Sequence, residues 1–392
     1  MNNKIIRITT VPMALRNLLR GQMKYMSANG FEVVMISADG AGYKEVLNNE
    51  QCRYILVPMT RKITPFQDLK CLLKLYRIIR KEKPAIVHTH TPKAGLLGMM
   101  AAAMCGTKIR IHTVAGLPLM TEHGLKYKLL KFIEEITYKS AMYVWPNSNS
   151  LYKYILEHKM VPSRKLKVIN KGSSNGIDLT RFDKESLNAH ILNEIKKQIQ
   201  YDEDAHYLLF IGRIVSDKGM SELITAFSRI LQKHSQVKLL LVGSYEPELD
   251  PLDEGILREI ENNTSIIHAG WSEHGEYYMA IADTFVFPSH REGFPNVVLQ
   301  AGAMDLPVIC SRIPGNIDII EDGVTGLLFE RGDEDALAEK ILYALSNPDA
   351  MHNVARLLKE KIRKDFAQEK IWASIREEYN ALLQERDNKA VA

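Results

Sequence analysis

The sequence predicts an α/β protein of two domains, each built around a doubly wound and mostly parallel sheet. The first observation is length, because 392 residues exceed a single domain of about 150 residues. The second is a repeated alternation of short β-rich runs with longer helical stretches. The third is a break in that alternation at residues 168–182, where VINKGSSNGIDLTRF is rich in Gly, Ser and Asn and predicts a linker.

The alternation places six strands on each side of the linker. Before it we expect strands at Ile5–Thr10, Glu32–Ser37, Tyr54–Pro58, Ile86–Thr89, Lys108–Thr113 and Tyr143–Pro146. After it we expect strands at Tyr207–Ile211, Lys238–Val242, Ser265–Ala269, Thr284–Pro288, Pro307–Cys310 and Gly326–Phe329. Helical patterns lie at Asn17–Asn29, Pro65–Lys81, Lys218–His234, Asn296–Met304 and Glu334–Leu345, and a charged helical stretch covers about 350–386.

These elements predict a first domain at 1–175 and a second at 176–367, with a C-terminal helix, about 368–392, packing back on the first. Ligands of open α/β sheets bind beyond the carboxyl ends of the strands. Two such domains facing each other would therefore enclose a cleft, which is the default active site.

Charge divides between the two halves of the chain. The composition, 46% apolar and 25% charged, is that of a globular protein and excludes disorder, collagen-like fibre and a small disulfide scaffold. Residues 1–181 hold 29 Lys and Arg against 11 Asp and Glu, whereas residues 182–392 hold 22 against 36. The net charge of +4 therefore hides a basic half and an acidic half.

Three features predict a soluble or peripheral protein of the cytoplasm. The four cysteines are far apart and form no C-x-x-C pair, which fits a reducing compartment. The first residues, MNNKIIRITTV, lack the apolar region of a signal peptide. The longest mostly apolar uncharged run, at 94–106, is too short for a bilayer, which needs about 20 residues.

The segment FPSHREGFPNVVLQAGAMDLPVICS, 287–311, predicts a phosphate-binding turn. A strand ends at Pro288, Gly293 permits close backbone approach, and a helix begins near Asn296 with unpaired N–H groups and a positive dipole end. Glu292 would repel a phosphate, so we expect it to contact sugar hydroxyls. Gln300 follows eight residues later, about two helical turns on and on the same face. A helix cap with a solvated Glu is the alternative for this segment alone.

The segment FIGRIVSDKGMSELITAF, 210–227, predicts a second part of the same site. A buried strand leads into Gly212 and Arg213, and Lys218 with Gly219 opens the next helix. Two cations at the carboxyl end of a strand suit a diphosphate, although the P-loop pattern is absent.

In this order and spacing, the two segments resemble the retaining glycosyltransferases of family 4, which have the two-domain GT-B fold. The linker NGIDLTRF (175–182), the stretch AGWSEHGEYYMAIADTFVFPS (269–289) and the first-domain stretch HTHTPKAGLLGMMAAAMCGTKIRIHTVAGLP (88–118) are similar to that family too. The last stretch resembles members that build bacterial capsule, exopolysaccharide and lipopolysaccharide. The resemblance covers nearly the whole chain and is unspecific for the sugar.

The resemblance implies a role for each matching residue. Arg213 and Lys218 would neutralise the leaving diphosphate of a UDP- or GDP-sugar, and Glu292 would contact the donor sugar, so these three are the catalytic candidates. The donor-binding candidates are Gly212, Arg213, Lys218, Glu292, Gly293, Phe294, Pro295, Asn296, Val297 and Gln300. Backbone N–H groups of residues 293–296 would lie near the phosphates.

Two positions depart from the family pattern. Gln300 stands where the family usually has a Glu that holds the ribose hydroxyls, which replaces a charge-assisted hydrogen bond of about 1.5–3 kcal/mol by a neutral one of about 1 kcal/mol. Ala115 stands where many relatives have a His near the donor sugar. His112 and His90 are the nearby histidines, and a core or loop histidine is the alternative for each.

The acceptor side is expected on the first domain. Residues 9–22, TTVPMALRNLLRGQ, form the expected loop after the first strand. The acceptor-side candidates are Arg16, Asn17, Arg20, Gly21, His90, Lys93 and His112. For the arginines, a helix start with exposed side chains is an equal alternative.

The expected partners are a nucleotide sugar, a lipid-linked glycan acceptor and an anionic membrane at the inner face of the plasma membrane. Amphipathic patterns at Pro65–Lys83 and His123–Ser140 carry basic residues and could lie on such a surface. No nucleic-acid partner is expected, since no binding signature accompanies the charge. The resemblance implies that no metal is needed, and no cofactor is expected. Asp202-Glu203-Asp204 spells D-x-D, the metal-binding motif of other glycosyltransferases, but it precedes a strand and predicts a solvated turn.

The sequence leaves two alternatives to a glycosyltransferase. One is another enzyme of the same fold, a nucleotide-sugar epimerase or a phosphorylase. The other is a non-catalytic nucleotide-sugar-binding assembly partner, which Ala115 and Gln300 keep open.

Overall fold

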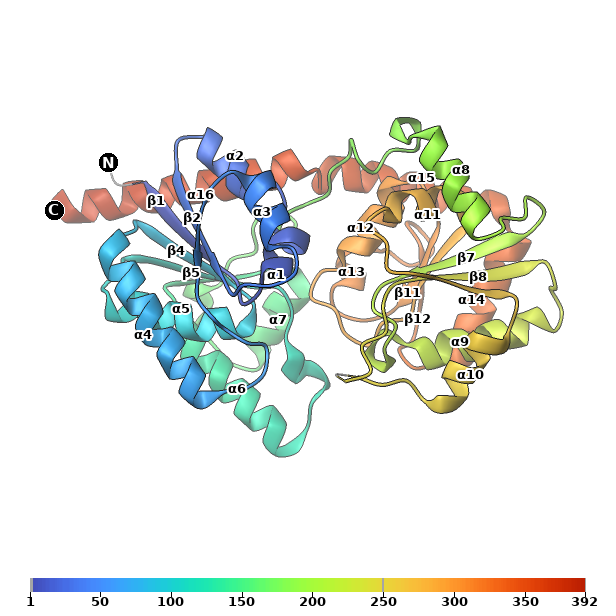
Figure 1. Cartoon of the computed structure of the whole chain (residues 1–392), viewed down its shortest axis with the longest axis horizontal. Helices are drawn as coiled ribbons and strands as arrows, with labels where there is room; N and C mark the ends of the chain where they lie inside the picture. The colour runs from blue at the N-terminus through green and yellow to red at the C-terminus, as the bar shows by residue number, and fades with distance from the viewer. Residues whose placement is uncertain (1–2, 249, 392) are drawn as a thin grey trace. The chain divides into compact units, whose positions relative to one another are not determined.

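The computed structural model describes residues 3–248 and 250–391 (Figure 1). The chain divides into two compact units, one of residues up to Gly176 with those from Gln368 on, and one of residues Ile177–Ala367. We call them unit 1 and unit 2. Unit 1 holds 32 Lys and Arg against 15 Asp and Glu, and unit 2 holds 19 against 32.

Unit 1 is built on a six-stranded parallel sheet in the order β3-β2-β1-β4-β5-β6. The strands are β1 (Lys4–Ile8), β2 (Glu32–Ser37), β3 (Arg53–Leu56), β4 (Ile86–His90), β5 (Ile109–Val114) and β6 (Tyr143–Pro146). The helices are α1 (Pro12–Leu18), α2 (Gln22–Ala28), α3 (Tyr43–Glu50), α4 (Pro65–Glu82), α5 (Pro92–Met104), α6 (Gly124–Ser140), α7 (Asn149–Glu157) and α16 (Gln368–Val391). Short 3₁₀ turns are η1 (Pro118–Thr121) and η2 (Ser163–Lys165).

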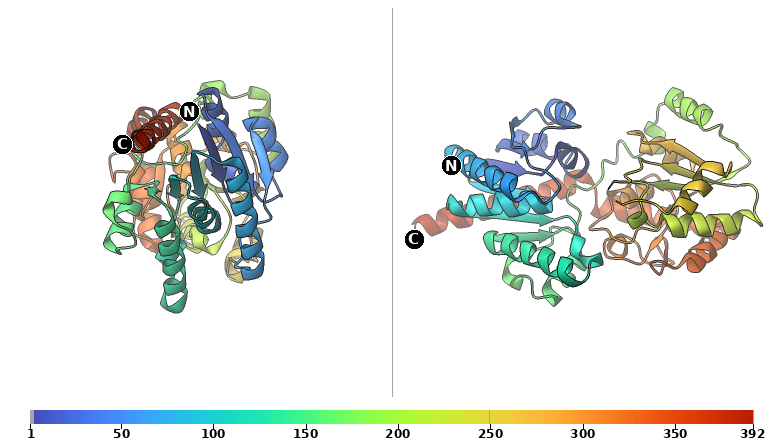
Figure 2. Two further views of the ribbon diagram at one scale, coloured as in Figure 1. Left: turned by 90° about the vertical axis from the view of Figure 1, so that its left-hand side faces the viewer. Right: turned by 60° about the horizontal axis from the view of Figure 1, so that its bottom comes forward.

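Alternate residues of the unit 1 strands pack on opposite faces of the sheet, as a strand's two-residue period requires. Ile6 and Ile8 of β1 join the apolar core under α4, α5, α6 and α7. Ile5 of the same strand joins the core under α1, α2, α3 and α16. Figure 2 shows the layers of helices on both sides of this sheet.

The C-terminal helix α16 covers one face of the unit 1 sheet. Its buried side chains are Ile371, Ile375, Tyr379 and Leu382. Tyr379 reaches the buried cation of β1, where its hydroxyl accepts a hydrogen bond from the Arg7 guanidinium and lies 2.5 Å from Nδ1 of His88. Trp372 donates its Nε1–H to Asn175 at 2.7 Å, which ties α16 to the end of the first segment.

Unit 2 has a second six-stranded parallel sheet in the order β12-β11-β10-β7-β8-β9. The strands are β7 (His206–Ile211), β8 (Val237–Val242), β9 (Ile266–Gly270), β10 (Thr284–Phe287), β11 (Val308–Ser311) and β12 (Leu327–Phe329). The helices are α8 (Ala189–Gln198), α9 (Met220–Leu231), α10 (Glu254–Asn262), α11 (Gly275–Ile281), α12 (Asn296–Ala303), α13 (Asn316–Ile319), α14 (Glu334–Ser346) and α15 (Pro348–Asp365). Two 3₁₀ turns, η3 (Lys184–Ser186) and η4 (Ser216–Lys218), complete it.

The expected α/β class and the twelve expected strands are confirmed, with ends that differ by one or two residues. Two expectations about helices are wrong. Residues 9–22 are not a single loop, since α1 lies inside them, and the expected helix Asn17–Asn29 is broken at Gly21, whose φ of 80° starts α2. The stretch 350–386 is helical as expected, apart from a break at Phe366, where the chain leaves α15 to pair beside Ile177, and the expected C-terminal helix at about 368–392 is α16.

Candidate active site

Two turns meet at the carboxyl edge of the unit 2 sheet. The first turn, residues 212–219, follows β7, and the second turn, residues 288–295, follows β10. β7 and β10 are neighbours, and the connections from β7 and from β10 lead to opposite sides of the sheet. This is the switch point at which open α/β sheets bind ligands.

Glycines allow the two turns to pack backbone to backbone. Gly219 has a φ of 71°, and a Cβ at this position would overlap the carbonyl oxygen of Pro288. Gly315, in the loop after β11, has a φ of 89°, and its Cβ would lie 2.8 Å from the carbonyl oxygen of Gly293. A side chain at either position would force the turns apart.

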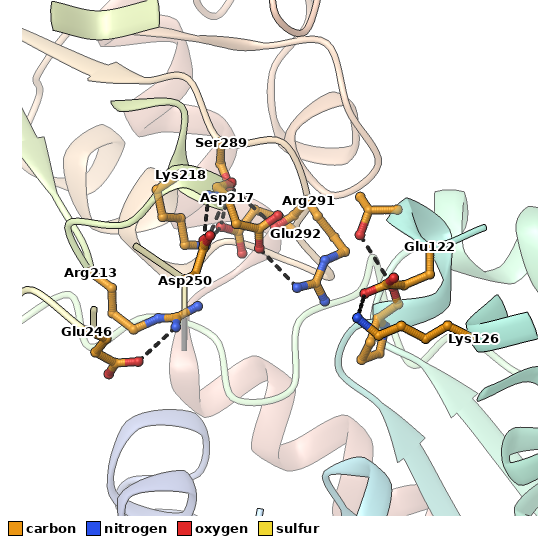
Figure 3. Close-up of polar contacts among 12 residues, drawn as sticks. Glu122, Lys126, Arg213, Asp217, Lys218, Glu246, Asp250, Ser289, Arg291 and Glu292 are labelled. Carbon is orange, nitrogen blue, oxygen red and sulfur yellow. Dashed lines mark hydrogen bonds and ion pairs between the residues drawn. The ribbon is translucent and has the colours of Figure 1, made fainter. Parts of the chain in front are cut away.

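Lys218 and Glu292 are brought together by this packing (Figure 3). The Lys218 ammonium forms an ion pair with Oε1 of Glu292, and both side chains are largely buried. Ser289 donates its hydroxyl to the same carboxylate oxygen at 3.0 Å. Lys218 Nζ also lies 5.7 Å from the centroid of the Phe287 ring. The pair is thus fixed from several sides before any ligand is present.

Arg213 lies apart from this pair and is more exposed. Its Nη1 donates to Oε2 of Glu246, at 2.9 Å, in the loop after β8 (Figure 3). Arg213 and Lys218 were expected together at one diphosphate. In the structure each of them pairs with a different carboxylate, Glu246 for Arg213 and Glu292 for Lys218. An incoming diphosphate would compete with Glu246 for Arg213.

Several residues of the two turns were missed by the sequence analysis. Arg291 donates to Asp217 at 2.9 Å, and the Asp217 N–H donates to Asp250 at 2.7 Å. His290 forms a 2.6 Å ion pair with Glu222. His290 and Arg291 directly precede Glu292 in the sequence, but their partners lie about 70 residues away and could not be identified by spacing.

Helix α12 begins where the sequence analysis expected it, at Asn296, with Pro295 at its N-cap and no side chain capping it. In its first turn, the Val298 N–H donates to the carbonyl oxygen of Pro295 at 3.1 Å, and the helix dipole places partial positive charge at this end. Pro295 itself has no N–H, so it cannot be one of the expected donors. Phe294 is buried against Phe366, with ring centroids 5.3 Å apart, and shapes the turn from within the core.

The expected helical relation between Glu292 and Gln300 is wrong. Glu292 lies in the turn before α12, so only the last part of the interval is helical. Gln300 is partly exposed on α12, and Val297 is partly exposed in its first turn. Gly212 is also partly exposed, at the end of β7.

The expected acceptor-side residues before α2 have mostly structural contacts. Arg16 pairs with Glu45 at 2.5 Å. Gly21 donates its N–H to Glu50 at 2.5 Å, and a Cβ there would lie 2.7 Å from the Trp372 ring. Asn17 and Arg20 are exposed.

Lys93 and His112 are engaged inside unit 1, which argues against the acceptor-side role expected for them. Lys93 binds Asp68 at 2.8 Å and the Thr60 hydroxyl at 3.2 Å, which holds the segment before α4. His112 is buried, its ring packs against Gly95, and its Nδ1 lies 2.9 Å from the Thr89 hydroxyl. Burial lowers the pKa of His112 to about 4, so it is neutral near pH 7.

His90 ends β4 and is buried, with its ring stacked on His88 at 4.3 Å. Neither ring nitrogen has a hydrogen-bond partner among the described residues. Burial, together with the nearby Arg7, holds the pKa of His90 well below its usual range. Thr91, next in the chain, has a φ of 72° and a ψ of 144°, which is rare for a β-branched residue. An unpartnered imidazole beside a strained residue marks this strand end as the most unusual point of unit 1.

Within residues 3–248 and 250–391, no group of three or more His, Cys, Asp and Glu side chains is arranged to hold a metal ion. Residues 202–204 form an exposed turn before β7, in which Glu203 pairs with Lys196 at 2.7 Å. The same described part of the chain contains no helix long and apolar enough to cross a membrane.

Comparison with known proteins decides the family. Residues 192–364 match the model "Glycosyl transferases group 1", and residues 14–148 match "Glycosyl transferase 4-like". The chain is 37% identical to the capsular polysaccharide biosynthesis glycosyltransferase CapM of Staphylococcus aureus, over 99% of this chain and 100% of that protein. It belongs to the family 4-like, group 1 glycosyltransferases.

Two further similarities agree with this glycosyltransferase family. The chain is 24% identical to an Escherichia coli UDP-Gal:alpha-D-GlcNAc-diphosphoundecaprenol alpha-1,3-galactosyltransferase, over 93% of each protein. It is also similar to the solved structure of Anabaena Alr3699/HepE in complex with UDP and glucose, with a TM-score of 0.80, 16% identity, and coverage of 96% of this chain and 99% of that one. The second similarity shows the fold, which is the two-domain GT-B fold that the sequence predicted.

As a transferase, this protein has two features of use to group transfer at the edge of unit 2. The Lys218 ammonium and the positive dipole end of α12 can stabilise negative charge, and the Glu292 carboxylate can accept hydrogen bonds from hydroxyls. In unit 1, Thr113, two residues before Ala115, shares a hydrogen bond of 2.7 Å with His88.

Proposed function

We propose that this glycosyltransferase moves a sugar from a nucleotide diphosphate sugar to a hydroxyl of a lipid-linked glycan, with retention at the anomeric carbon. The acceptor is a glycan on polyprenyl diphosphate, and the product enters a bacterial surface polysaccharide. The capsular role of the Staphylococcus aureus relative and the diphosphoundecaprenol acceptor in the name of the Escherichia coli relative support this assignment.

The observation that carries the proposal is the Lys218–Glu292 pair at the switch point of unit 2. In the proposed complex, Lys218 and Arg213 bind the diphosphate, the first N–H groups of α12 face its oxygens, and Glu292 accepts hydrogen bonds from the sugar. As the bond between the anomeric carbon and the phosphate oxygen breaks, negative charge grows on the diphosphate. Fixed donors that stabilise such charge are each worth about 2.7–4 kcal/mol of the barrier in comparable enzymes.

The donor base is uracil or guanine, and a bound divalent metal is not needed in this proposal because protein cations fill that role. The UDP in the Anabaena structure and the UDP-Gal in the Escherichia coli relative's name favour uracil. Turnover in the presence of EDTA tests the metal-free part, and loss of activity there would contradict it.

The test is transfer from a panel of UDP- and GDP-sugars to polyprenyl diphosphate-linked acceptors, followed by mass spectrometry and by NMR of the new anomeric centre. Arg213→Ala, Lys218→Ala and Glu292→Ala are compared with Arg229→Ala, a surface cation of unit 2 that pairs with Glu334 and Asp335. We expect the first three to lose activity and the control to keep it. Full activity in all of them, or conversion of the donor without an acceptor, would refute the proposal.

We also propose that unit 1 lies on the anionic inner face of the plasma membrane. Helix α5 packs between α4 and α6 on one face of the unit 1 sheet (Figure 1). Outward-facing apolar side chains gather on these two helices and before α4: Ile63, Phe66, Leu69, Leu73, Leu125, Leu129 and Phe132. Phe66 is 88% exposed and Leu125 is 84% exposed, which is unusual for large apolar side chains. We call this set the apolar patch.

Basic residues lie on the same helices as the apolar patch. They are Lys70, Lys74, Arg77, Arg80 and Lys81 on α4, and Lys126, Lys128, Lys131 and Lys139 on α6. Apolar side chains that enter the headgroup region, flanked by cations worth about 1 kcal/mol each near an anionic surface, are typical of peripheral membrane helices. This would bring unit 1 to the surface that holds a lipid-linked acceptor.

Flotation with vesicles of phosphatidylglycerol or of phosphatidylcholine tests membrane binding. Phe66→Ser with Phe132→Ser should weaken binding to the anionic vesicles, and high salt should weaken it too. Tyr343→Ser, which removes an exposed aromatic of unit 2, is the matched control. Absence of binding at low salt would refute this second proposal.

A further inference from the structure

The two turns of unit 2 are joined by contacts that involve neither Lys218 nor Glu292. The backbone N–H of His290 donates to the carbonyl oxygen of Asp217 at 2.9 Å. The Asp217 carboxylate accepts from Arg291 at 2.9 Å (Figure 3). Residues 290 and 291 of the second turn thus both form hydrogen bonds with Asp217 of the first turn, which directly precedes Lys218.

The imidazole of His290 connects the second turn to helix α9 as well. Its Nε2 lies 2.6 Å from Oε1 of Glu222, in the first turn of α9, the helix that follows Lys218 and Gly219. Both side chains are mostly buried. Because Gly219 lies against Pro288, any movement of the second turn away from α9 would carry Glu292 away from Lys218.

We propose that His290 is a positioning residue of the donor site: its protonated imidazole, held by Glu222, keeps the second turn against the first so that Lys218 and Glu292 stay in register for the donor diphosphate. The proposal rests on the function proposed above. It adds that donor binding depends on the protonation of His290, a residue that does not touch the donor.

The charged groups around His290 favour the protonated form. The hydrogen bond to Glu222 raises the pKa of His290, and the negative charges of Glu222 and Asp217 raise it further, against the opposing effects of burial and of Arg331. On the other side of the pair, burial opposes ionisation of Glu222, but its hydrogen bonds to His290 and to its own backbone N–H lower its pKa overall. Below the pKa of His290 the pair is ionic, and above it only a neutral hydrogen bond remains.

Donor affinity should therefore fall as the pH rises through the pKa of His290. We would measure the affinity for UDP and GDP by calorimetry between pH 6 and 9, and KM and kcat for the nucleotide sugar over the same range. His290→Gln should weaken binding several-fold at pH 6 and flatten the profile, with a larger effect on KM than on kcat. Glu222→Gln should move the midpoint of the profile to lower pH. His190→Gln, which alters an exposed His near Glu194 on α8, is the matched control.

NMR titration of His290 in the wild type and in Glu222→Gln tests the pair independently of nucleotide binding. If Glu222→Gln does not lower the pKa of His290, or if His290→Gln keeps the wild-type pH profile of affinity, the proposal is overturned. If the NMR shift is found but neither UDP nor GDP binds the wild type, the donor site and the proposed function fail while the His290–Glu222 pair stands.

Discussion

Units 1 and 2 have the same strand order and differ at the carboxyl edges of their sheets. In each unit the first strand lies between the second and the fourth, so both have the same switch point. At this edge, unit 1 carries the paired hydroxyls of Thr10 and Thr91, 2.8 Å apart, and the imidazole of His90, together with the ion pair of Lys93 and Asp68. Unit 2 carries ion pairs, Lys218 with Glu292 and Arg213 with Glu246.

This difference shows that topology decides where a site forms and that the residues at the strand ends decide its chemistry. An edge of fixed cations suits a leaving group that gains negative charge. An edge of hydroxyls and neutral imidazoles suits a hydroxyl acceptor. Four tests, made with seven substitutions, examine this comparison.

The largest effect is expected from the lysine pairs. Lys218 and Lys93 are matched, since each pairs with a carboxylate and their side chains are 13% and 12% exposed. Lys218→Ala should lower the rate of sugar transfer by about 10²–10³-fold, because it removes a donor to the leaving diphosphate. Lys93→Ala should leave the affinity for a nucleoside diphosphate within about twofold, because Lys93 only holds the segment before α4. Equal losses of nucleoside diphosphate affinity in Lys218→Ala and Lys93→Ala would show that the two edges do not differ in diphosphate binding.

The next effect concerns backbone packing in unit 2. Gly219 and Gly323 have nearly equal φ angles, 71° and 74°, but only Gly219 faces backbone atoms, whereas no heavy atom among the described residues lies within 4 Å of a Cβ at Gly323. Gly219→Ala should cost about 3 kcal/mol of unfolding free energy, from strain and from overlap with Pro288. Gly323→Ala should cost about 1 kcal/mol, from strain alone. Urea unfolding of both variants measures the difference, and equal costs would contradict the close packing of the two turns.

A third test compares the effect of a buried carboxylate on stability in each unit. In unit 1, burial raises the pKa of Glu134 to about 7, although a hydrogen bond to Tyr138 opposes it. Because this pKa lies above the unfolded value of 4.5, the carboxyl contributes stability fully below pH 4.5, and that contribution is lost as the pH rises through about 7. Glu134→Gln should therefore remove about 2–3 kcal/mol of the loss in stability between pH 5 and pH 9.

Glu276 of unit 2 provides the contrast, since it is equally buried but paired with Arg181 at 2.8 Å. Glu276→Gln should destabilise the protein at both pH values by breaking that pair. Chemical unfolding at pH 5 and pH 9 checks both variants. An unchanged pH dependence in Glu134→Gln would show that this carboxyl is not the titrating group.

The smallest effect is expected at Glu246. If its carboxylate occupies Arg213 in place of the donor phosphates, Glu246→Gln should raise the affinity for a nucleoside diphosphate by about two- to fivefold, less than 1 kcal/mol for an exposed pair. Calorimetry with UDP measures this change. A weaker affinity in the variant would mean that Glu246 orients Arg213 instead of competing for it.

The sequence predicted the strands and the two turns because each follows from local patterns, but it did not predict that Lys218 pairs with Glu292, 74 residues away. Gly212, Lys218, Glu292 and the start of α12 lie where strand ends and glycines placed them. It could not predict the contacts of His290 and Arg291, because these depend on segments about 70 residues apart.

The first domain was predicted less well for a related reason. His112 and Lys93 were chosen because they lie near strand ends, but the sequence did not show which neighbours would surround them. In the structure, Gly95 leaves room for the His112 ring, and Asp68 holds Lys93. These contacts give both side chains a structural partner, and their acceptor-side role stays a prediction.

Helix α16 has a consequence for the order in which the protein folds during synthesis. Unit 2 is one continuous segment, whereas unit 1 takes its first residues from the start of the chain and α16 from its end. Until α16 leaves the ribosome, one face of the unit 1 sheet lacks Ile371, Ile375 and Tyr379, and the buried Arg7 lacks its tyrosine partner. The synthesis of unit 1 therefore starts before that of unit 2 but is completed after it. Until α16 has been made, one apolar face of the unit 1 sheet stays uncovered.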